Sequence, residues 1–273
     1  MWSVGGFAAG GIGWLMAHNG VDGRPHFAGM AIFVAAVSIA VYSGLAAPLH
    51  TSAAAVSTED DKGPRFAFPR GAILVIGLVG FASIFAEASG ADWSAVYIVN
   101  DLRGAQATGA VAYACFAGAM TIGRLTGDTV VRRFGPVPTV RTAGTLGVLG
   151  GILIVAAGFG DLKVLAVAGF TLVGVGIAVV VPLAFSAAGH AAKTPAARAH
   201  AIAGVATVAY GAGLAAPGII GGVAAATNLR VSFVVVTALV LIMTLAAPVL
   251  KGAGAEDLSA AEESAGRTPV AAS

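Results

Sequence analysis

Eight long runs without a charged residue constrain the fold of this chain more than any other feature of the sequence. These runs are residues 2–16, 26–47, 71–86, 104–123, 142–160, 164–189, 201–229 and 231–250. A helix needs roughly 20 apolar residues to cross a bilayer, and in lipid it must satisfy its own backbone hydrogen bonds. Most runs are long enough, 71–86 becomes so if it continues past Glu87, and only 2–16 is short. We therefore expect an all-α, polytopic membrane bundle of eight transmembrane helices.

The basic residues predict how the helices are oriented. If Met1 is cytoplasmic and each run crosses once, 11 of the 15 lysines and arginines fall in cytoplasmic segments. This asymmetry follows the positive-inside rule, and the opposite orientation violates it. With 58% hydrophobic and 10% charged residues, we expect the lipid bilayer to be the main partner of the chain. The basic residues form no single patch, so nucleic acid is not an expected partner.

A polar linker and an internal repeat predict the domain organisation. Residues 48–69 form the longest polar interruption and separate two helices in 1–47 from six in 70–250, while 251–273 is a polar tail that we expect to be disordered and cytoplasmic. The stretch 6–12 resembles 213–219, and such repeats are typical of transporters. We therefore interpret 1–47 as the last two helices of an N-terminal six-helix bundle, with four more helices missing before Met1.

Two clusters of residues resemble a known family. The first is Glu87-Ala-Ser-Gly-Ala-Asp92-Trp93-Ser94-Ala-Val-Tyr97, and the second runs from Gly123-Arg124 through Gly127-Asp128 and Arg132-Arg133 to Gly135-Pro136. Together with the helix count they resemble the C-terminal part of a major facilitator superfamily transporter. The nearest branch looks like the fucose-permease-like and uncharacterised permeases of bacterial inner membranes. The resemblance implies a multi-pass protein that moves a small solute, such as a sugar or a drug-like molecule, by alternating access.

The second cluster is predicted to form a cytoplasmic gating loop. Arg124, Asp128 and Arg132 are spaced by four residues, so they can share one helical face and pair in sequence. Gly123 opens the cluster, Gly127 permits close approach of a neighbouring helix, and Gly135 with Pro136 ends the helix. A charged latch of this kind can hold two helices in one state of a transport cycle. The alternative is a simple topology anchor of basic residues. Thr129 departs from the family pattern, in which a basic residue follows the aspartate.

Glu87 and Asp92 are candidate residues of a substrate and proton pathway. Acidic residues inside a membrane span are costly and mark ion or substrate paths by default. Counting from Arg70 at about 1.5 Å per residue, Glu87 lies about 25 Å into its helix. We expect a break at Gly90, with Asp92 capping a second half-helix.

Three neighbours of these acids are candidate substrate contacts. Trp93 and Tyr97 offer ring faces, and Ser94 offers a hydroxyl. The alternatives are that Asp92 is only a cap and that the two aromatic residues belong to the membrane interface. Pro182 and Pro217 are expected to kink their helices.

Other classes of function are less well supported by the sequence. The five histidines and the single Cys115 show no metal-ligand spacing, no phosphate-binding loop appears, and we expect no cofactor, no metal and no catalytic residue. The prediction is a transporter coupled to a proton gradient, rather than an enzyme. The alternative is a truncated, non-transporting remnant, or a subunit that needs a partner chain for the missing helices. An intramembrane enzyme is a more distant third reading, with only Glu87 and Asp92 as an acid pair.

Overall fold

The structure is a computed structural model that describes residues 2–20, 24, 28–40, 71–192 and 194–253. The predicted linker 48–69 and nearly all of the predicted tail 251–273 therefore lie outside the described residues. By internal contacts the chain divides into two compact units, residues 15–67 and residues 1–14 with 68–273. The helices of 71–253 carry both candidate clusters.

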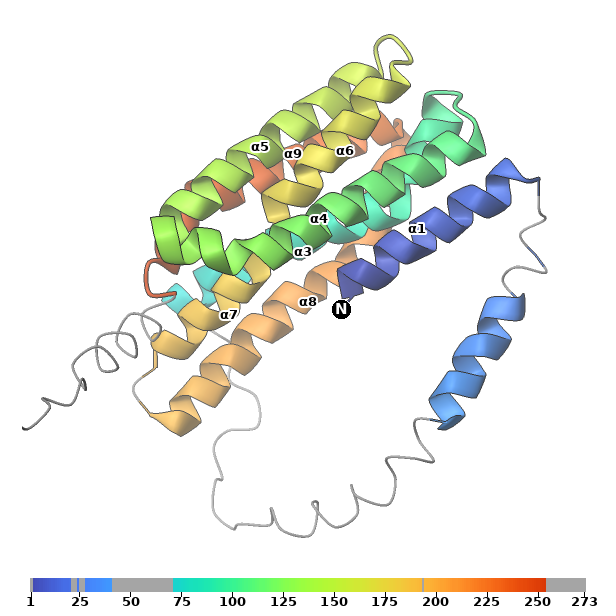
Figure 1. Cartoon of the computed structure of the whole chain (residues 1–273). Coiled ribbons are helices and arrows are strands. Elements are labelled where there is room, and N and C mark those ends of the chain that lie inside the picture. Colours follow the sequence, from blue (N-terminus) through green and yellow to red (C-terminus); the bar gives the residue numbers. More distant parts are fainter. Residues whose placement is uncertain (1, 21–23, 25–27, 41–70, 193, 254–273) are drawn as a thin grey trace, which may run out of the picture. The chain divides into compact units, whose positions relative to one another are not determined.

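Every regular element in the described residues is a helix, which confirms the all-α prediction (Figure 1). The elements are α1 (Trp2–His18), a helix over Ala28–Ala40, α3 (Ala72–Val96), the π-helix η1 (Tyr97–Asp101), α4 (Gln106–Phe134), α5 (Pro136–Ala157), α6 (Lys163–Ile177), α7 (Val180–His190), α8 (Pro195–Ala226), α9 (Leu229–Leu245) and the 3₁₀ helix η2 (Ala247–Leu250). Each of the eight charge-free runs overlaps a helix, and the run 164–189 overlaps two, α6 and α7.

The described residues hold four helical segments that are long and apolar enough to cross a membrane. These are Ala72–Asp101, Pro136–Ala157, Lys163–His190 and Ala197–Ala226. The apolar helices Ala28–Ala40 and Leu229–Leu245 are shorter. The structure thus supports a multi-pass membrane protein, and the full count of eight crossings stays a prediction.

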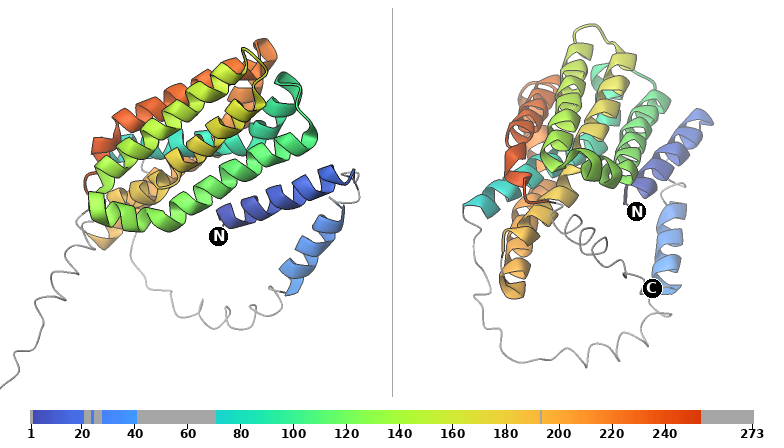
Figure 2. Two further views of the ribbon diagram at one scale, coloured as in Figure 1. Left: turned by 45° about the horizontal axis from the view of Figure 1, so that its top comes forward. Right: turned by 60° about the vertical axis from the view of Figure 1, so that its left-hand side comes forward.

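Glycines bring α5 and α6 into close contact in the bundle of residues 71–253. A Cβ atom placed on Gly150 of α5 would lie 2.5 Å from the carbonyl oxygen of Gly169 in α6, and one on Gly169 would lie 2.6 Å from that of Gly150. Lipid does not drive helices together by the hydrophobic effect, so small residues that let backbones approach are an effective means of association. In Figures 1 and 2, α6 lies between α5 and α4, and it packs extensively against both.

The predicted bend at Pro182 is present as a break between α6 and α7. The helix ends at Ile177 and resumes at Val180, because proline has no N–H to bond the carbonyl four residues earlier. The Ser83 hydroxyl of α3 donates to the carbonyl of Ile177 at 3.3 Å. This contact satisfies one of the carbonyl groups at the end of α6. By contrast, α8 remains one helix through Pro217.

A single residue connects α4 to α5. Gly135 has φ +83°, a left-handed conformation that favours glycine, and Pro136 begins α5 at the position where helices tolerate proline best. The prediction that Gly135 and Pro136 end the helix is confirmed.

Candidate functional site

The helix that carries Glu87 and Asp92 is continuous, so the predicted break at Gly90 is wrong. α3 runs without interruption from Ala72 to Val96, and Asp92 lies inside it rather than capping a second helix. The reason for glycine at position 90 is packing: a Cβ atom there would lie 2.6 Å from Cζ of Phe116 in α4. Gly90 therefore makes room for an aromatic ring, and the backbone hydrogen bonds of α3 continue through it.

Glu87 and Arg124 form an ion pair between α3 and α4. Nη2 of Arg124 donates to Oε2 of Glu87 at 2.8 Å. The side chains are 18% exposed for Glu87 and 28% exposed for Arg124, so both are largely withdrawn from the surface. The sequence placed these two residues in separate clusters, and the structure brings them together.

Asp92, Trp93 and Ser94 follow Glu87 on α3 but have different surroundings. Asp92 is exposed, and Trp93 is half-buried, with its ring next to Gly221 of α8. Ser94 is fully buried. Trp93 Nε1 and Ser94 Oγ are buried without a hydrogen-bond partner among the residues that the structure describes. Buried polar atoms normally have partners, so these two groups are free to bond with water or a solute.

Tyr97 belongs to the core of the bundle. It is fully buried, its hydroxyl donates to the carbonyl of Ile154 at 2.9 Å, and its ring meets Phe170 and Phe233 edge-on. In this arrangement its ring faces are covered by protein.

Tyr113 of α4 was missed by the sequence reasoning. It is half-buried and lies in the neighbourhood of Asp92 and Glu87 of α3. The sequence carried a weak signal, because Tyr113 is one of only four tyrosines in the chain and lies inside an apolar run.

The second cluster is helical almost to its end. Residues 123–133 lie in the last turns of α4, and Gly135 follows the helix as its cap. A Cβ atom on Gly123 would lie 2.7 Å from Cβ of Ala178, and one on Gly127 would lie 2.5 Å from Cγ1 of Val179. The expected close approach at Gly127 is therefore present, and the neighbour is the α6–α7 break.

Among the described residues, the ion pair found for Arg124 is with Glu87 on another helix, and none joins Arg124 to Asp128 or Asp128 to Arg132 along α4. Arg132 donates to the hydroxyl of Thr129 at 3.4 Å, and the Arg133 guanidinium lies 5.5 Å from the centre of the Phe134 ring. Asp128 is exposed and, with Arg124, lines a cavity of about 30 Å³ beside the α6–α7 break. That volume suits about one water molecule.

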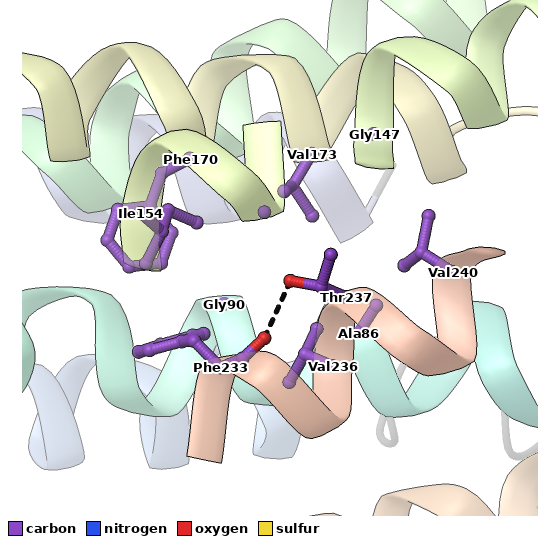
Figure 3. A pocket seen from close by; sticks show the side chains of 11 residues that line it. Ala86, Gly90, Gly147, Ile154, Phe170, Val173, Phe233, Val236, Thr237 and Val240 are labelled. Carbon is purple, nitrogen blue, oxygen red and sulfur yellow. Dashed lines mark hydrogen bonds between the residues drawn. The ribbon is translucent and has the colours of Figure 1, made fainter. Parts of the chain in front are cut away.

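The interior of the bundle offers no room for a solute between α3, α5, α6 and α9. The void there has a volume of about 10 Å³ and is lined almost entirely by apolar side chains, among them Ile154, Phe170 and Phe233 (Figure 3). The Thr237 hydroxyl at its edge donates back to the carbonyl of Phe233 in its own helix at 2.7 Å. The polar group around Glu87 lies instead on the α3 face next to α4.

Known relatives of the chain are named as transporters or membrane proteins. It is 35% identical over 253 residues to the uncharacterised transporter y4wD of Sinorhizobium fredii, covering 92% of this chain and 64% of the relative. It is 39% identical over 192 residues to an uncharacterised MFS-type transporter of Yersinia pestis, covering 70% and 48%. It is 28% identical over 174 residues to the membrane protein MosC of Rhizobium meliloti, covering 64% and 42%.

No family profile matches the chain. The chain spans between 42% and 64% of the length of these relatives. Together with the long apolar helices, the relatives support a multi-pass membrane protein similar to transporters of the major facilitator (MFS) type.

Proposed function

We propose that the chain is part of a secondary active transporter of the major facilitator type, in a bacterial inner membrane, that moves a small solute by alternating access with protons as the coupling ion. The observation that carries this proposal is the ion pair that joins Glu87, inside the apolar helix α3, to Arg124 of α4. Ionisable groups inside a membrane span are costly and are associated with ion and substrate pathways. The transporter names of the relatives support the same function, and the Asp92-Trp93-Ser94 stretch favours the fucose-permease-like branch.

The ion pair suits proton coupling because only one of its partners can change charge. A carboxylate can take up a proton and become neutral, whereas arginine stays charged. Protonation of Glu87 removes the attraction that this pair provides between α3 and α4. Loss of the proton restores the pair. The two helices are thereby bound more tightly in one protonation state than in the other.

The solute path is proposed to run along the exposed face of α3. α4 and α8 pack on either side of α3 without extensive contact with each other. Asp92 of α3 is exposed, and α8 exposes the large side chains of Tyr210 at 60% and Leu214 at 88%. Such a face suits closure by a second helical bundle in a complete transporter. Tyr113 and the unpartnered Trp93 Nε1 are further candidate contacts for a sugar or a drug-like molecule.

The test begins with finding a ligand. The purified chain, and the longest natural protein that contains it, are screened by thermal shift against sugars and amphiphilic drugs. The proteins are then reconstituted in liposomes with a pH-sensitive dye inside, and solute-driven proton flux is measured. We expect Glu87→Gln to abolish the flux while membrane insertion is unchanged.

The matched control is Asp161→Asn, which neutralises an exposed carboxylate in the turn between α5 and α6. We expect it to keep normal flux. Proton-coupled transport by Glu87→Gln at the normal rate removes Glu87 from the mechanism. A protein that binds solutes but moves none, in either length, favours the alternative of a non-transporting remnant or a subunit.

A further inference from the structure

The apolar span Ala72–Asp101 ends in a π-helix rather than in a regular α-helical turn. η1 covers Tyr97–Asp101, and the amide of Leu102 donates to the carbonyl of Tyr97, five residues earlier, at 3.1 Å. Arg103 then has the left-handed φ of +50°, and α4 begins three residues later. Turns of the π type are rare in proteins and are often found at functional sites. The contacts that hold this turn are therefore of interest.

Hydrogen bonds to other helices anchor both ends of η1. At its start, the Tyr97 hydroxyl donates to the carbonyl of Ile154 in α5 at 2.9 Å. At its end, Oδ1 of Asp101 accepts a hydrogen bond from the amide of Leu229, the first residue of α9, at 3.3 Å. The first amides of a helix have no partner within that helix, so Asp101 satisfies one of those of α9. η1 is thereby fixed to α5 at one end and to α9 at the other.

Arg230 joins the two anchoring helices to each other. Its Nη1 donates to the carbonyl of Gly158, the residue after α5, at 3.3 Å, and its guanidinium lies 4.3 Å from the centre of the Phe159 ring. A Cβ atom on Gly158 would lie 2.7 Å from both the Tyr97 hydroxyl and Cδ of Arg230, so glycine at this position lets the two side chains meet. Three hydrogen bonds, which we call the η1 ring, therefore connect η1, α5 and α9 in a closed circuit: Tyr97–Ile154, Asp101–Leu229 and Arg230–Gly158.

We propose that η1 is a locked turn, held in its π form by the η1 ring acting as one cooperative unit. A single hydrogen bond stabilises a fold only modestly, but residues that share partners are energetically coupled. Breaking any side of the ring should therefore loosen η1, even where the altered side chain bonds to α5. The inference concerns the end of α3 farthest from Ala72 and does not depend on the proposed role of Glu87 in transport.

The experiment measures hydrogen exchange of single amides by NMR, on the purified chain in detergent micelles. The reporter is the amide of Leu102, whose hydrogen bond to Tyr97 closes the π turn. Arg230→Met keeps an unbranched side chain and removes the guanidinium, and we expect it to speed exchange at Leu102 about fivefold. Lys163→Met is the matched control, because Lys163 is half-buried at the start of α6, just after the turn that contains Phe159. It removes the same charge and should leave Leu102 unchanged.

A second pair of variants tests the ring without changing the charge. Gly158→Ala places a methyl group against Tyr97 and Arg230 and should also speed exchange at Leu102. Gly160→Ala adds the same group in the same turn, where the nearest atom lies 3.5 Å from the new Cβ. It should leave the exchange rate of Leu102 at the wild-type value.

A distant amide distinguishes loosening of η1 from general destabilisation. The amide of Ala191, bonded to a carbonyl at the end of α7, should exchange at the wild-type rate in all four variants. An unchanged rate at Leu102 in Arg230→Met overturns the proposal, because the three hydrogen bonds are then independent. So does a control variant that speeds exchange at Leu102 as much as its partner, or an equal acceleration at Ala191.

Discussion

The ion pair between Glu87 and Arg124 makes a quantitative prediction about how α3 and α4 are held together. Exposed pairs contribute about 0.2–1 kcal/mol, and removing one partner of a fully buried pair costs about 3–5 kcal/mol. The two side chains are 18% and 28% exposed, which lies between these limits. We therefore expect Glu87→Gln to lower the free energy of unfolding by about 2 kcal/mol, because Arg124 keeps its positive charge when the opposing carboxylate is gone.

The opposite replacement should cost less. Arg124→Gln leaves a carboxyl group that can accept a proton and become neutral, so we expect a loss of about 1 kcal/mol. In the double variant, two neutral amides face each other and neither charge is unpaired. We expect its loss to be smaller than the sum of the single losses by about 1–2 kcal/mol.

The assay is unfolding of the chain in mixed micelles by titration with a denaturing detergent, followed by circular dichroism. Asp161→Asn serves as the control for removal of a charge and should change the free energy of unfolding by less than about 0.5 kcal/mol. If the losses of the two single variants add up in the double variant within about 0.5 kcal/mol, the pair does not couple α3 to α4, and the reasoning is refuted.

Two further predictions concern packing. Gly150→Ala should destabilise the bundle by about 1–3 kcal/mol in the same titration, because its Cβ would lie 2.5 Å from the carbonyl oxygen of Gly169. Gly213→Ala is the control, because no atom lies within 4 Å of its Cβ. It should be neutral or stabilising by up to about 1 kcal/mol. Equal effects would show that α5 and α6 do not depend on close approach. Ser83→Ala should speed hydrogen exchange of the amides in α7, because it removes the hydroxyl that bonds to α6 at the break. Ser89→Ala is its control, since that hydroxyl bonds within α3, and faster exchange in both variants would contradict the prediction.

The helices could be predicted from the sequence because their signals are local. Charge-free runs, the Gly135-Pro136 corner and the proline at 182 each act on the backbone within a few residues. The same reasoning failed at Gly90, where glycine was read as a break. Glycine at this position makes room for the Phe116 ring, and no local pattern indicates which helix supplies that ring.

The candidate site was predicted only in part for a similar reason. Spacing by four residues correctly identified residues that can meet on one helix, so it favoured pairing of Arg124 with Asp128. The actual partner, Glu87, is 37 residues away, and finding it requires knowing that α3 and α4 are neighbours. Tyr97 likewise looked like an accessible aromatic residue, and its burial depends on rings from α6 and α9.

The interruption at Ala178 and Val179 has a structural consequence. α6 is fastened to α5 through glycine contacts along its length, whereas α7 begins afresh beyond the joint and packs mainly on α3 and α8. The break therefore divides this span into two halves with different neighbours, and the glycine contacts with α5 belong to the α6 half.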